Sequence, residues 1–489
     1  MQKIIIVGGG SAGWMAAAAL ANAFGKTQEI MLIESDNIAT IGVGEATVPA
    51  IRPFNKLLGI DEREFLRVTN GTFKLGIQFE NWGAIGEKYI HPFGLVGKDS
   101  WMANFQHFWL KAHQQGVAKD YWDYSLNIRT AKANKFNLDA AAGLEYAYHF
   151  DSSLYAAYLR QYSEALGVKR IEGTINNVNT NKSNGYIESL DLESGENIQG
   201  DFFIDCSGFR ALLIEKTLHT GFEDWSHWLP CDSAIAVQTE STEEPRPYTR
   251  SIAHPIGWQW RIPLQHRVGN GLVYCSRYIS DNDATTLLLK NVEGDLKTEP
   301  KVIKFRTGRA LQQWNKNCVA IGLSSGFLEP LESTSLHLIQ TGIIRLIKMF
   351  PNGNIHQSEI DEYNRQSKFE YDHIRDFIIL HYHATKRTDS MFWNYCRTMR
   401  IPETLANKIA IYRASCAVFR DQDELFHEGS WQQVMYGQGI TPENFHPVVN
   451  KLSSEELLTF LQGVDLNITA LVNSYPSHQT FLDHYCKSS

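Results

Sequence analysis

The pattern of hydrophobic and polar residues predicts a βαβ unit at the start of the chain. The β-branched run KIIIV at 3–7 is followed by glycines and by an alanine-rich stretch at 15–24, which indicates a strand, a tight turn and a helix. A second apolar run, EIMLIE at 29–34, ends in an acid. Strand, helix and strand in this order are typical of a parallel βαβ unit.

Further apolar runs continue this mixed pattern to about residue 350. Residues 152–167 predict a helix, and 170–205 predict short strands and hairpins that end in the buried strand DFFID at 201–205. The run VAIG at 319–322 predicts another buried strand, before an amphipathic helix at 335–350. We therefore expect an α/β fold.

A second strand pair is expected at 257–277, where GWQWRIPL and GLVYCSRYI are separated by Gly269, Asn270 and Gly271, which we interpret as a turn. Beyond about residue 355 the pattern is mostly helical, in several segments. No repeat, low-complexity tract or long linker interrupts the sequence, so we expect its modules to interleave.

The composition is typical of a folded globular protein. The chain has 489 residues, well beyond the size at which one hydrophobic core stops growing, so two packed modules are expected. Hydrophobic residues make up 43% of the chain, which is too many for a disordered protein. The net charge of −8 argues against a nucleic-acid partner, because such a surface needs a basic excess.

The cysteines and the apolar stretches indicate a cytoplasmic protein with no metal site. The seven cysteines are odd in number, scattered and without a Cys-x-x-Cys pair, so neither a disulfide framework nor a zinc site is indicated. Gly8, Gly9 and Gly10 interrupt the first apolar stretch where a secretory signal would be continuous. No later segment has the roughly 18 uninterrupted apolar residues of a membrane span, so no membrane partner is expected.

The glycine-rich turn after the first strand predicts a dinucleotide site. It satisfies G-x-G-x-x-G: Gly8 permits a tight turn, Gly10 lets the backbone approach a pyrophosphate, and Gly13 allows close packing of helix on strand. A negative phosphate then lies at the positive end of the helix. Glu34 follows roughly 20 positions after Gly13, where an acid can bind a ribose hydroxyl.

Five separated motifs, in order, resemble the flavin-dependent tryptophan halogenase family, which is itself similar to the flavin monooxygenases. The resemblance extends over nearly the whole chain, to about residue 450. The motifs are GGGSAGWMAA in the glycine turn, IGVGEATVP (41–49), TFKLGIQFENW (72–82), GWQWRIP (257–263) and FLEPLESTS (327–335).

The resemblance implies a Rossmann-like FAD-binding fold of the flavoprotein monooxygenase type, with a mixed sheet and a mostly helical substrate module. We expect an FAD-binding module at 1–354, interleaved with substrate-binding segments at about 70–140 and 215–300, and a helical substrate module at 355–489. The implied cofactor-binding residues are Gly8, Gly10, Ser11, Ala12, Gly13, Glu34, Gly44, Glu45, Ala46, Thr47, Asp205, Gly322 and Ser333. For Asp205, packing is an equal alternative.

The implied reaction uses reduced FAD (FADH2), O2 and chloride or bromide to form hypohalous acid, which halogenates an electron-rich aromatic ring. Lys74 matches the family lysine that holds hypohalous acid or captures the halogen as a haloamine, and Glu332 matches the glutamate beside it. The alternatives are a surface lysine and a helix-start acid. Thr334 and Ser335 match the halide-binding turn, although some members have glycine at Ser335.

The block W-x-W-x-I-P distinguishes the family from hydroxylating relatives. Trp258, Trp260 and Pro263 occupy it, and in the family it is thought to keep substrate away from the flavin. The alternative is aromatic core packing on alternate faces of a strand. Either interpretation leaves the two tryptophans without a chemical step.

The substrate is expected to be an indole or a similar ring, such as a substituted indole, a phenol or a larger peptide-like substrate. His91 and Phe93, in HPFG, match the segment that lies against the indole, although His91 could be structural. The segment 418–439 lacks the Tyr-Tyr and Phe-Trp pairs with which relatives bind free tryptophan. Free tryptophan is therefore the less favoured substrate.

Two other functions stay open at this point. An FAD-dependent aromatic hydroxylase would share the dinucleotide turn but would not need Lys74 with Glu332. A non-catalytic flavin-binding protein would show no turnover. A reductase fused to a halogenase would show a second glycine turn, and the sequence after residue 330 has none. A separate NAD(P)H-dependent flavin reductase is therefore the expected partner. A homodimer is common in the family.

Overall fold

The computed structural model describes residues 2–37, 44–100 and 103–488. The chain folds into two compact units, each made of three segments. Unit 1 comprises residues 1–70, 150–232 and 304–372, and unit 2 comprises residues 71–149, 233–303 and 373–489. The predicted division into an FAD-binding and a substrate module stays a prediction, because packing groups the segments without identifying their ligands.

Unit 1 is built around a mixed six-stranded sheet. Parallel pairs join β1 to β2 and β12, β2 to β8, and β12 to β21, while β20 and β21 are antiparallel. In sheet order the strands are β20 (Trp314–Asn315), β21 (Cys318–Ala320), β12 (Phe202–Asp205), β1 (Lys3–Val7), β2 (Glu29–Glu34) and β8 (Lys169–Glu172). The predicted βαβ unit is confirmed, since α1 (Ser11–Phe24) connects β1 to β2.

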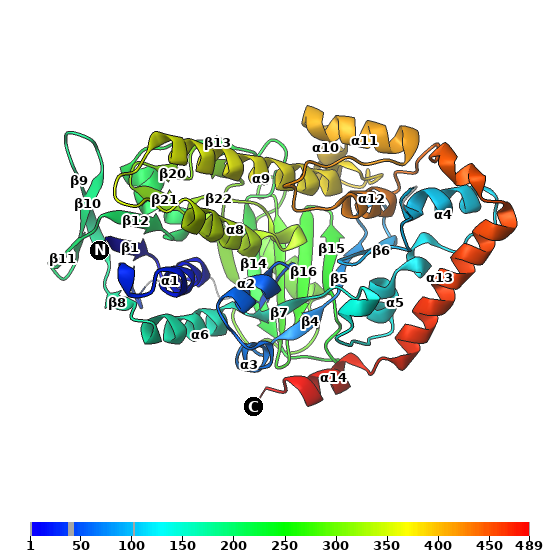
Figure 1. The fold of residues 1–489 in the computed structure, drawn as a ribbon, viewed down its shortest axis with the longest axis horizontal. Helices are drawn as coiled ribbons and strands as arrows, with labels where there is room; N and C mark the ends of the chain where they lie inside the picture. Colours follow the sequence, from blue (N-terminus) through cyan, green and yellow to red (C-terminus); the bar gives the residue numbers. More distant parts are fainter. Residues whose placement is uncertain (1, 38–43, 101–102, 489) are drawn as a thin grey trace. The chain divides into compact units, whose positions relative to one another are not determined.

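Helices cover this sheet, and α1 packs against α6 and α8 (Figure 1). The predicted helices at 152–167 and 335–350 are confirmed as α6 (Ser152–Ala165) and α8 (Ser335–Lys348). Other helices and turns of unit 1 are η1 (Gly25–Thr27), α2 (Ile51–Leu57), α3 (Glu62–Val68), η4 (Gly208–Arg210), η5 (Leu212–Thr217), η6 (Gly322–Ser324) and η7 (Pro330–Glu332).

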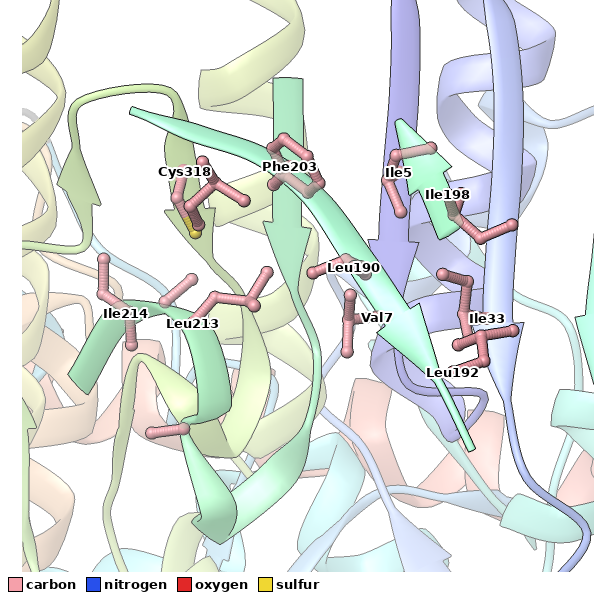
Figure 2. Packing of buried hydrophobic residues seen from close by; sticks show 13 residues of the cluster. Ile5, Val7, Ile33, Leu190, Leu192, Ile198, Phe203, Leu213, Ile214 and Cys318 are labelled. Carbon is pink, nitrogen blue, oxygen red and sulfur yellow. The ribbon is translucent and has the colours of Figure 1, made fainter. Parts of the chain in front are cut away.

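A three-stranded antiparallel sheet closes the core of unit 1. It consists of β9 (Ile175–Thr180), β10 (Ile187–Leu192) and β11 (Asn197–Gln199). Its Leu190, Leu192 and Ile198 pack with Ile5 of β1 and Phe203 of β12 (Figure 2). Burial of such side chains contributes roughly 1.5–3 kcal/mol each. A second small sheet consists of β13 (Phe222–Asp224), β19 (Gly308–Ala310) and β22 (Gly326–Phe327), and β3 (Gly44–Ala46) also belongs to unit 1.

Unit 2 is built around a seven-stranded sheet. The pairs β14–β17, β17–β16, β16–β15 and β5–β6 are antiparallel, whereas β15 and β5 are parallel. In sheet order the strands are β18 (Lys301–Lys304), β14 (Ser233–Thr239), β17 (Val268–Tyr274), β16 (Gly257–Pro263), β15 (Thr249–His254), β5 (Gly76–Glu80) and β6 (Lys88–Pro92). Separately, β4 (Thr72–Lys74) pairs antiparallel with β7 (Ala147–Asp151).

The predicted strand pair at 257–277 is confirmed as β16 and β17, but the turn predicted at Gly269–Gly271 is wrong. Those residues lie inside β17, and the chain turns at 264–267, where the Leu264 N–H donates to the Arg267 carbonyl at 2.9 Å. Gly271 lies opposite Trp260, and a Cβ atom there would come within 2.0 Å of the indole. The glycine therefore makes room for a ring within the sheet.

The C-terminal region is helical, as predicted. In unit 2, α13 packs against α4 and α5 (Figure 1). The C-terminal helices and turns are α10 (Met391–Thr398), α11 (Glu403–Ser415), α12 (Glu428–Gly437), η8 (Pro447–Lys451), α13 (Ser454–Ser474) and α14 (His478–Tyr485). Earlier in the chain, unit 2 also contains α4 (Phe105–Gln114), η2 (Tyr121–Tyr124), α5 (Leu126–Lys132), η3 (Ala140–Ala142) and α7 (Asp281–Asn291). The long helix α9 (Gln357–His383) contributes to both units. Among the described residues, no helix is long and apolar enough to cross a membrane.

Candidate active site

The predicted dinucleotide turn joins β1 to α1 at the carboxyl end of a central strand. Gly8 has a φ of +108°, which glycine adopts without strain, and its N–H donates to the Ile33 carbonyl at 2.8 Å. Gly10 is the N-cap of α1 and no side chain caps this end. A Cβ atom on Gly10 would meet nothing within 4 Å. Uncapped backbone donors beside open space fit a phosphate group.

Two further glycines of the turn are needed for close packing. A Cβ atom on Gly13 would lie 1.8 Å from the Gly8 carbonyl oxygen, so the close approach of helix to strand predicted for Gly13 is present. A Cβ atom on Gly9 would lie 1.4 Å from Oε2 of Glu34. Sequence reasoning assigned no role to Gly9, although three consecutive glycines were a signal that each was needed.

Glu34 reaches the turn from the end of β2. Its Oε2 faces Gly9, and its Oε1 accepts a hydrogen bond from Nε of Arg170 on β8 at 2.5 Å. This hydrogen bond with Glu34 raises the pKa of Arg170 above its usual value. The arginine thus holds the acid that we expect to bind a ribose. Sequence reasoning missed Arg170, since it lies 136 positions from Glu34 and belongs to no motif.

The segment around Gly322 approaches the start of α1. Gly322 has a φ of +78°, and a Cβ atom there would come within 2.8 Å of the Cβ of Ala12. The Ile321 N–H donates to the Asp205 carbonyl at 2.9 Å, and the Ser324 hydroxyl donates to the same carbonyl. These bonds hold η6 against the end of β12. Two predicted cofactor-binding positions, Ala12 and Gly322, are thereby brought into contact.

The carboxylate of Asp205 accepts hydrogen bonds from the segment that follows β12. Its Oδ1 accepts from the N–H and the hydroxyl of Ser207 at 3.0 and 2.6 Å. Its Oδ2 accepts from the N–H groups of Leu213 and Ile214 at 2.8 and 2.9 Å, at the start of the π-helix η5. The packing alternative for this side chain is therefore present in the structure, and a cofactor contact of Asp205 stays a prediction.

The predicted flavin-contacting segment 41–49 is described from Gly44 onwards, and residues 41–43 lie outside the described residues. Gly44, Glu45 and Ala46 form β3, and Thr47 follows with a buried side chain. Burial raises the pKa of Glu45 to about 7, with a further contribution from the negative charge of Asp151. A carboxyl group with a pKa near neutrality can exchange a proton at working pH.

The residues around the start of α8 form a buried turn. Glu332 ends η7 with a 1% exposed side chain. Ser333 follows with a φ of +60°, in the left-handed region that few residues other than glycine adopt. Such a conformation costs on the order of 1–3 kcal/mol and is often found at functional sites.

Thr334 is the N-cap of α8, and no side chain caps that end. Its side chain is fully buried, and its hydroxyl has no hydrogen-bond partner among the residues that the structure describes. Ser335, the first residue of the helix, is partly exposed. A helix start with uncapped N–H groups is chemically suited to bind an anion.

Lys74 ends β4 and has no exposed side-chain surface. The surface alternative for this lysine is therefore wrong. Its Nζ lies 5.0 Å from the centre of the Phe93 ring, within the range of a cation–π contact. The structure thus brings the predicted catalytic lysine of unit 2 to the predicted substrate-binding phenylalanine.

His91 and Phe93 lie at the end of β6 and just after it. His91 is buried, and its ring lies 5.6 Å from Phe377 and 6.4 Å from Phe426. Phe377 and Phe426 stack with ring centres 3.7 Å apart and an interplanar angle of 17°. His91 therefore belongs to an aromatic cluster, in which Trp431 of α12 also contacts Phe377 edge-on. Sequence reasoning missed Phe377 and Phe426, which no motif marks.

The segment 418–439, which we expect near the substrate, is anchored by Glu424. Both carboxylate oxygens of Glu424 accept from Nζ of Lys408 at 2.9 Å, and Oε2 accepts from the Trp431 indole at 3.2 Å. Nζ of Lys408 also lies 4.3 Å from the centre of the Trp431 ring. This buried carboxylate is therefore occupied by the protein itself.

The signature tryptophans lie on one face of β16. Because they are two residues apart, the prediction that they could pack on alternate faces is wrong. Trp258 and Trp260 are buried, with ring centres 6.2 Å apart. The indole N–H of Trp260 has no hydrogen-bond partner within the described part of the chain. Pro263 ends the strand, and its carbonyl accepts from the Thr72 hydroxyl at 2.8 Å.

The predicted residues thus fall into groups within each unit. Unit 1 contains the dinucleotide turn, Glu34, the segment at 44–47 and the start of α8. Unit 2 contains Lys74, the aromatic cluster with His91 and the signature tryptophans. Lys74 and Glu332 belong to different units, so their cooperation stays a prediction.

Comparison with known proteins gives a family and several relatives. The sequence model of the tryptophan halogenase family matches residues 3–454. Tryptophan 7-halogenase RebH of Lentzea aerocolonigenes is 37% identical over 441 residues, which cover 86% of this chain and 83% of that protein. Tryptophan 6-halogenase SttH of Streptomyces toxytricini is 37% identical over 513 residues, which cover 98% of this chain and 97% of that protein.

Two solved structures share the fold over their full length. A flavin-dependent halogenase from Xanthomonas campestris has a TM-score of 0.98 and 51% identity, covering 100% of this chain and 99% of that chain. The flavin-dependent halogenase BrvH from Brevundimonas sp. BAL3 has a TM-score of 0.95 and 45% identity, covering 99% of both chains.

Proposed function

Since this chain belongs to the tryptophan halogenase family and is a flavin-dependent halogenase of an aromatic substrate, we propose that it uses FADH2, O2 and chloride or bromide to halogenate indole or an indole derivative. When bound, reduced FAD supplies the two electrons and two protons with which O2, halide and one further proton become hypohalous acid and water. Hypohalous acid then replaces a ring hydrogen by halogen and leaves a second water. The remaining steps belong to the residues of the chain.

We propose that unit 1 binds FAD. The start of α1, with Gly10, Ser11 and Ala12, would hold the pyrophosphate, and Glu34 would accept a hydrogen bond from a ribose hydroxyl. The segment at 44–47, with Gly322, Asp205 and Ser333, would lie along the cofactor. Support comes from the open space at Gly10 and from the contact of Gly322 with Ala12.

We propose that the start of α8 binds the halide. The backbone N–H groups at Thr334 and Ser335 would donate to it, because the positive end of a helix favours an anion. The left-handed Ser333 sets the direction of this turn, and Glu332 lies directly before it. The buried, unpaired hydroxyl of Thr334 supplies one more donor among the described residues.

Lys74 is proposed to hold the oxidised halogen for the substrate. Its ammonium would donate a hydrogen bond to hypohalous acid, or the neutral amine would bind the halogen, and burial protects either species from bulk water. Glu332 is proposed to accept the proton that the ring loses as it regains aromaticity. Trp258, Trp260 and Pro263 are proposed to keep the substrate from the cofactor.

We propose that the substrate is a neutral aromatic ring and not free tryptophan. Phe93, beside Lys74, offers a flat wall, and His91 belongs to a cluster with Phe377 and Phe426. The buried carboxylate of Glu424 is already paired with Lys408 and accepts from the Trp431 indole, so the protein itself supplies its partners. Free tryptophan would have to find other partners.

A separate NAD(P)H-dependent flavin reductase is proposed to supply FADH2, and a homodimer is proposed as the assembly. We place the enzyme in the cytoplasm, because its seven cysteines are buried and none of them forms a disulfide. No metal is proposed for the reaction.

The observation that carries the proposal is the buried Lys74 beside the Phe93 ring. The test supplies the enzyme with FAD, a reductase, bromide or chloride and a panel of aromatic compounds, and detects the halogen isotope pattern by mass spectrometry. For Lys74→Ala we expect oxidation of FADH2 by O2, followed as NAD(P)H consumption, to continue while halogenated product falls below detection.

Lys132→Ala is the matched control, since Lys132 is exposed on α5 of the same unit. This variant should keep the wild-type yield. Hydroxylated product without halogen would support the hydroxylase alternative, and a preference for free tryptophan over indole would overturn the proposed substrate.

A further inference from the structure

Among the described strands, the one that carries Lys74, β4, pairs on one side only, with β7. In the antiparallel register, Thr72 lies opposite His149 and Lys74 lies opposite Ala147. The N–H of Phe73, between them, points to the open side and needs an acceptor there. Buried N–H groups without a partner cost about 1–3 kcal/mol.

The acceptor is a histidine from the far end of the sequence. Nε2 of His478, the first residue of α14, accepts from the Phe73 N–H at 3.3 Å. Nδ1 of His478 lies 2.7 Å from the Pro245 carbonyl, which can only accept, so Nδ1 carries the ring proton. The imidazole thus stands between an N–H of the lysine strand and a carbonyl of the segment at 245–247.

The next N–H on the same side of the chain, that of Leu75, bonds to that segment directly. The Leu75 N–H donates to the Pro247 carbonyl at 2.7 Å. Lys74 therefore lies between two anchored amides, one held by a carbonyl and the other through the imidazole. If the imidazole were lost, only one of the two anchors would remain.

Aromatic packing fixes the position of the imidazole. His478 is fully buried, with its ring 6.2 Å from Phe73 and 6.0 Å from Phe136. Phe73 and Phe136 stack with ring centres 4.0 Å apart. The His478 N–H also donates to the Asn134 carbonyl at 2.8 Å. The histidine is therefore held among aromatic rings, away from solvent.

A second histidine holds the opposite side of the strand. Nδ1 of His149 lies 3.1 Å from the Thr72 hydroxyl, and Nε2 lies 2.8 Å from the Thr249 hydroxyl. Burial and the positive charge of Lys74 lower the pKa of His149 well below its usual value. Burial lowers the pKa of His478 to about 4. Both rings are therefore neutral at working pH and add no positive charge beside Lys74.

We propose that His478 is a positioning residue for Lys74, which it serves by accepting the Phe73 N–H and linking the lysine strand to Pro245. This inference rests on the proposed function of Lys74. It concerns a part of the chain beyond residue 454, where the match to the family model ends.

Two conservative variants separate the two hydrogen bonds of the ring. His478→Gln places an amide oxygen near the position of Nε2 and can still accept from Phe73, whereas His478→Asn reaches only the position of Nδ1 and Pro245. His484→Asn, on an exposed position of the same helix, is the control. Each holoenzyme is assayed for thermal unfolding, for hydrogen exchange of peptides that contain Phe73, and for halogenated product per flavin oxidised.

For His478→Asn we expect hydrogen exchange at Phe73 to become about tenfold faster, because the loss of one hydrogen bond corresponds to about that factor. We expect the product per flavin oxidised to fall about tenfold as well. The rate of flavin oxidation should not change. His478→Gln and His484→Asn should remain near wild type in both. The proposal is overturned if His478→Asn keeps Phe73 protected and the yield intact, or if both His478 variants lose yield equally in proportion to a lower melting temperature.

Failure of the proposed function gives a different result. If Lys74→Ala still halogenates, the role of Lys74 is wrong whatever the exchange data show. If Lys74→Ala is inactive and His478→Asn exposes the Phe73 amide without loss of yield, only the positioning role is overturned.

Discussion

Lys74 is a charged residue with no exposed side-chain surface, and burial of an ammonium group opposes folding unless other groups compensate. Proteins keep such a group where chemistry requires it. The same holds for Ser333, whose left-handed backbone is strained, and for the unpaired Thr334 hydroxyl among the described residues. At the residue scale, each of these three residues, to which the family resemblance assigns a role, thus carries an unfavourable feature.

This coincidence gives a prediction for Lys74→Met. Methionine has a similar length and no charge, so we expect halogenation to be lost while the free energy of unfolding changes by less than about 3 kcal/mol, because relief of the desolvation of the ammonium offsets the interactions that are lost with it. Urea unfolding followed by tryptophan fluorescence measures the first quantity. Lys132→Met, at an exposed position, should change neither stability nor yield. A clear loss of stability in Lys74→Met would show that the ammonium has a structural role.

Gly322 gives a second prediction at this scale. In Gly322→Ala, the added Cβ would meet that of Ala12 at 2.8 Å and displace the start of α1, so we expect weaker FAD binding together with a loss of about 1–3 kcal/mol in stability. Gly195→Ala is a matched control, because Gly195 also has a positive φ, +88°, but open space for a Cβ. It should lose stability and keep its FAD affinity. Flavin-fluorescence titration of the apoprotein distinguishes the two variants.

At the element scale, single side chains hold the turns that follow the strands. Asp205 binds the start of η5 through two backbone N–H groups, so the end of β12 and the π-helix form one unit. Arg170 of β8 in the same way holds Glu34 at the end of β2. The parallel strands place these turns at one edge of the sheet, which is where α/β proteins bind nucleotides.

We expect Asp205→Asn to destabilise the protein by about 2–4 kcal/mol, because an amide has one acceptor oxygen for two sets of buried N–H donors. Asp224→Asn is the control, since Asp224 binds the N–H and hydroxyl of Ser226 as Asp205 binds those of Ser207, but caps no helix. Its effect should remain below about 1 kcal/mol. Equal effects of the two variants in urea unfolding would contradict the capping role.

At the scale of the whole molecule, buried histidines make stability depend on pH. Burial lowers the pKa values of His107 and His478 to about 4 and that of His149 well below its usual value. Below about pH 6.5 the unfolded chain binds protons that the folded chain does not, so stability falls as the pH is lowered to about 4. Glu45 acts in the opposite direction, because its raised pKa of about 7 makes stability fall as the pH rises through neutrality.

His478→Gln should make this acid dependence shallower. A pKa shift from 6.5 to about 4 corresponds to about 3 kcal/mol, and the variant should lose that part of the difference in unfolding free energy between pH 7 and pH 4. His484→Gln should keep the wild-type slope, since His484 is exposed. The measurement is urea unfolding at several pH values. If the unfolding free energy of His478→Gln depends on pH as it does in the wild type, the lowered pKa of His478 is contradicted.

Local pattern was enough to predict much of unit 1. The strands at 3–7, 29–34 and 201–205 and the helices at 152–167 and 335–350 were predicted within a few residues, because apolar periodicity and glycine turns act between near neighbours. The turn at Gly269–Gly271 was predicted wrongly for the same reason. Glycine usually marks a turn, but Gly271 lies in a strand to accommodate an indole from the neighbouring strand.

The sequence by itself thus determined the βαβ unit, the dinucleotide turn and, through the family motifs, the candidate residues. Only the tertiary structure decided that Lys74 is buried, that it faces Phe93, and that an imidazole 405 positions from Phe73 holds its strand. Backbone periodicity is a property of neighbouring residues and can be read along the chain. Burial and partnership depend on which distant segments the topology brings together, and no local spacing encodes that.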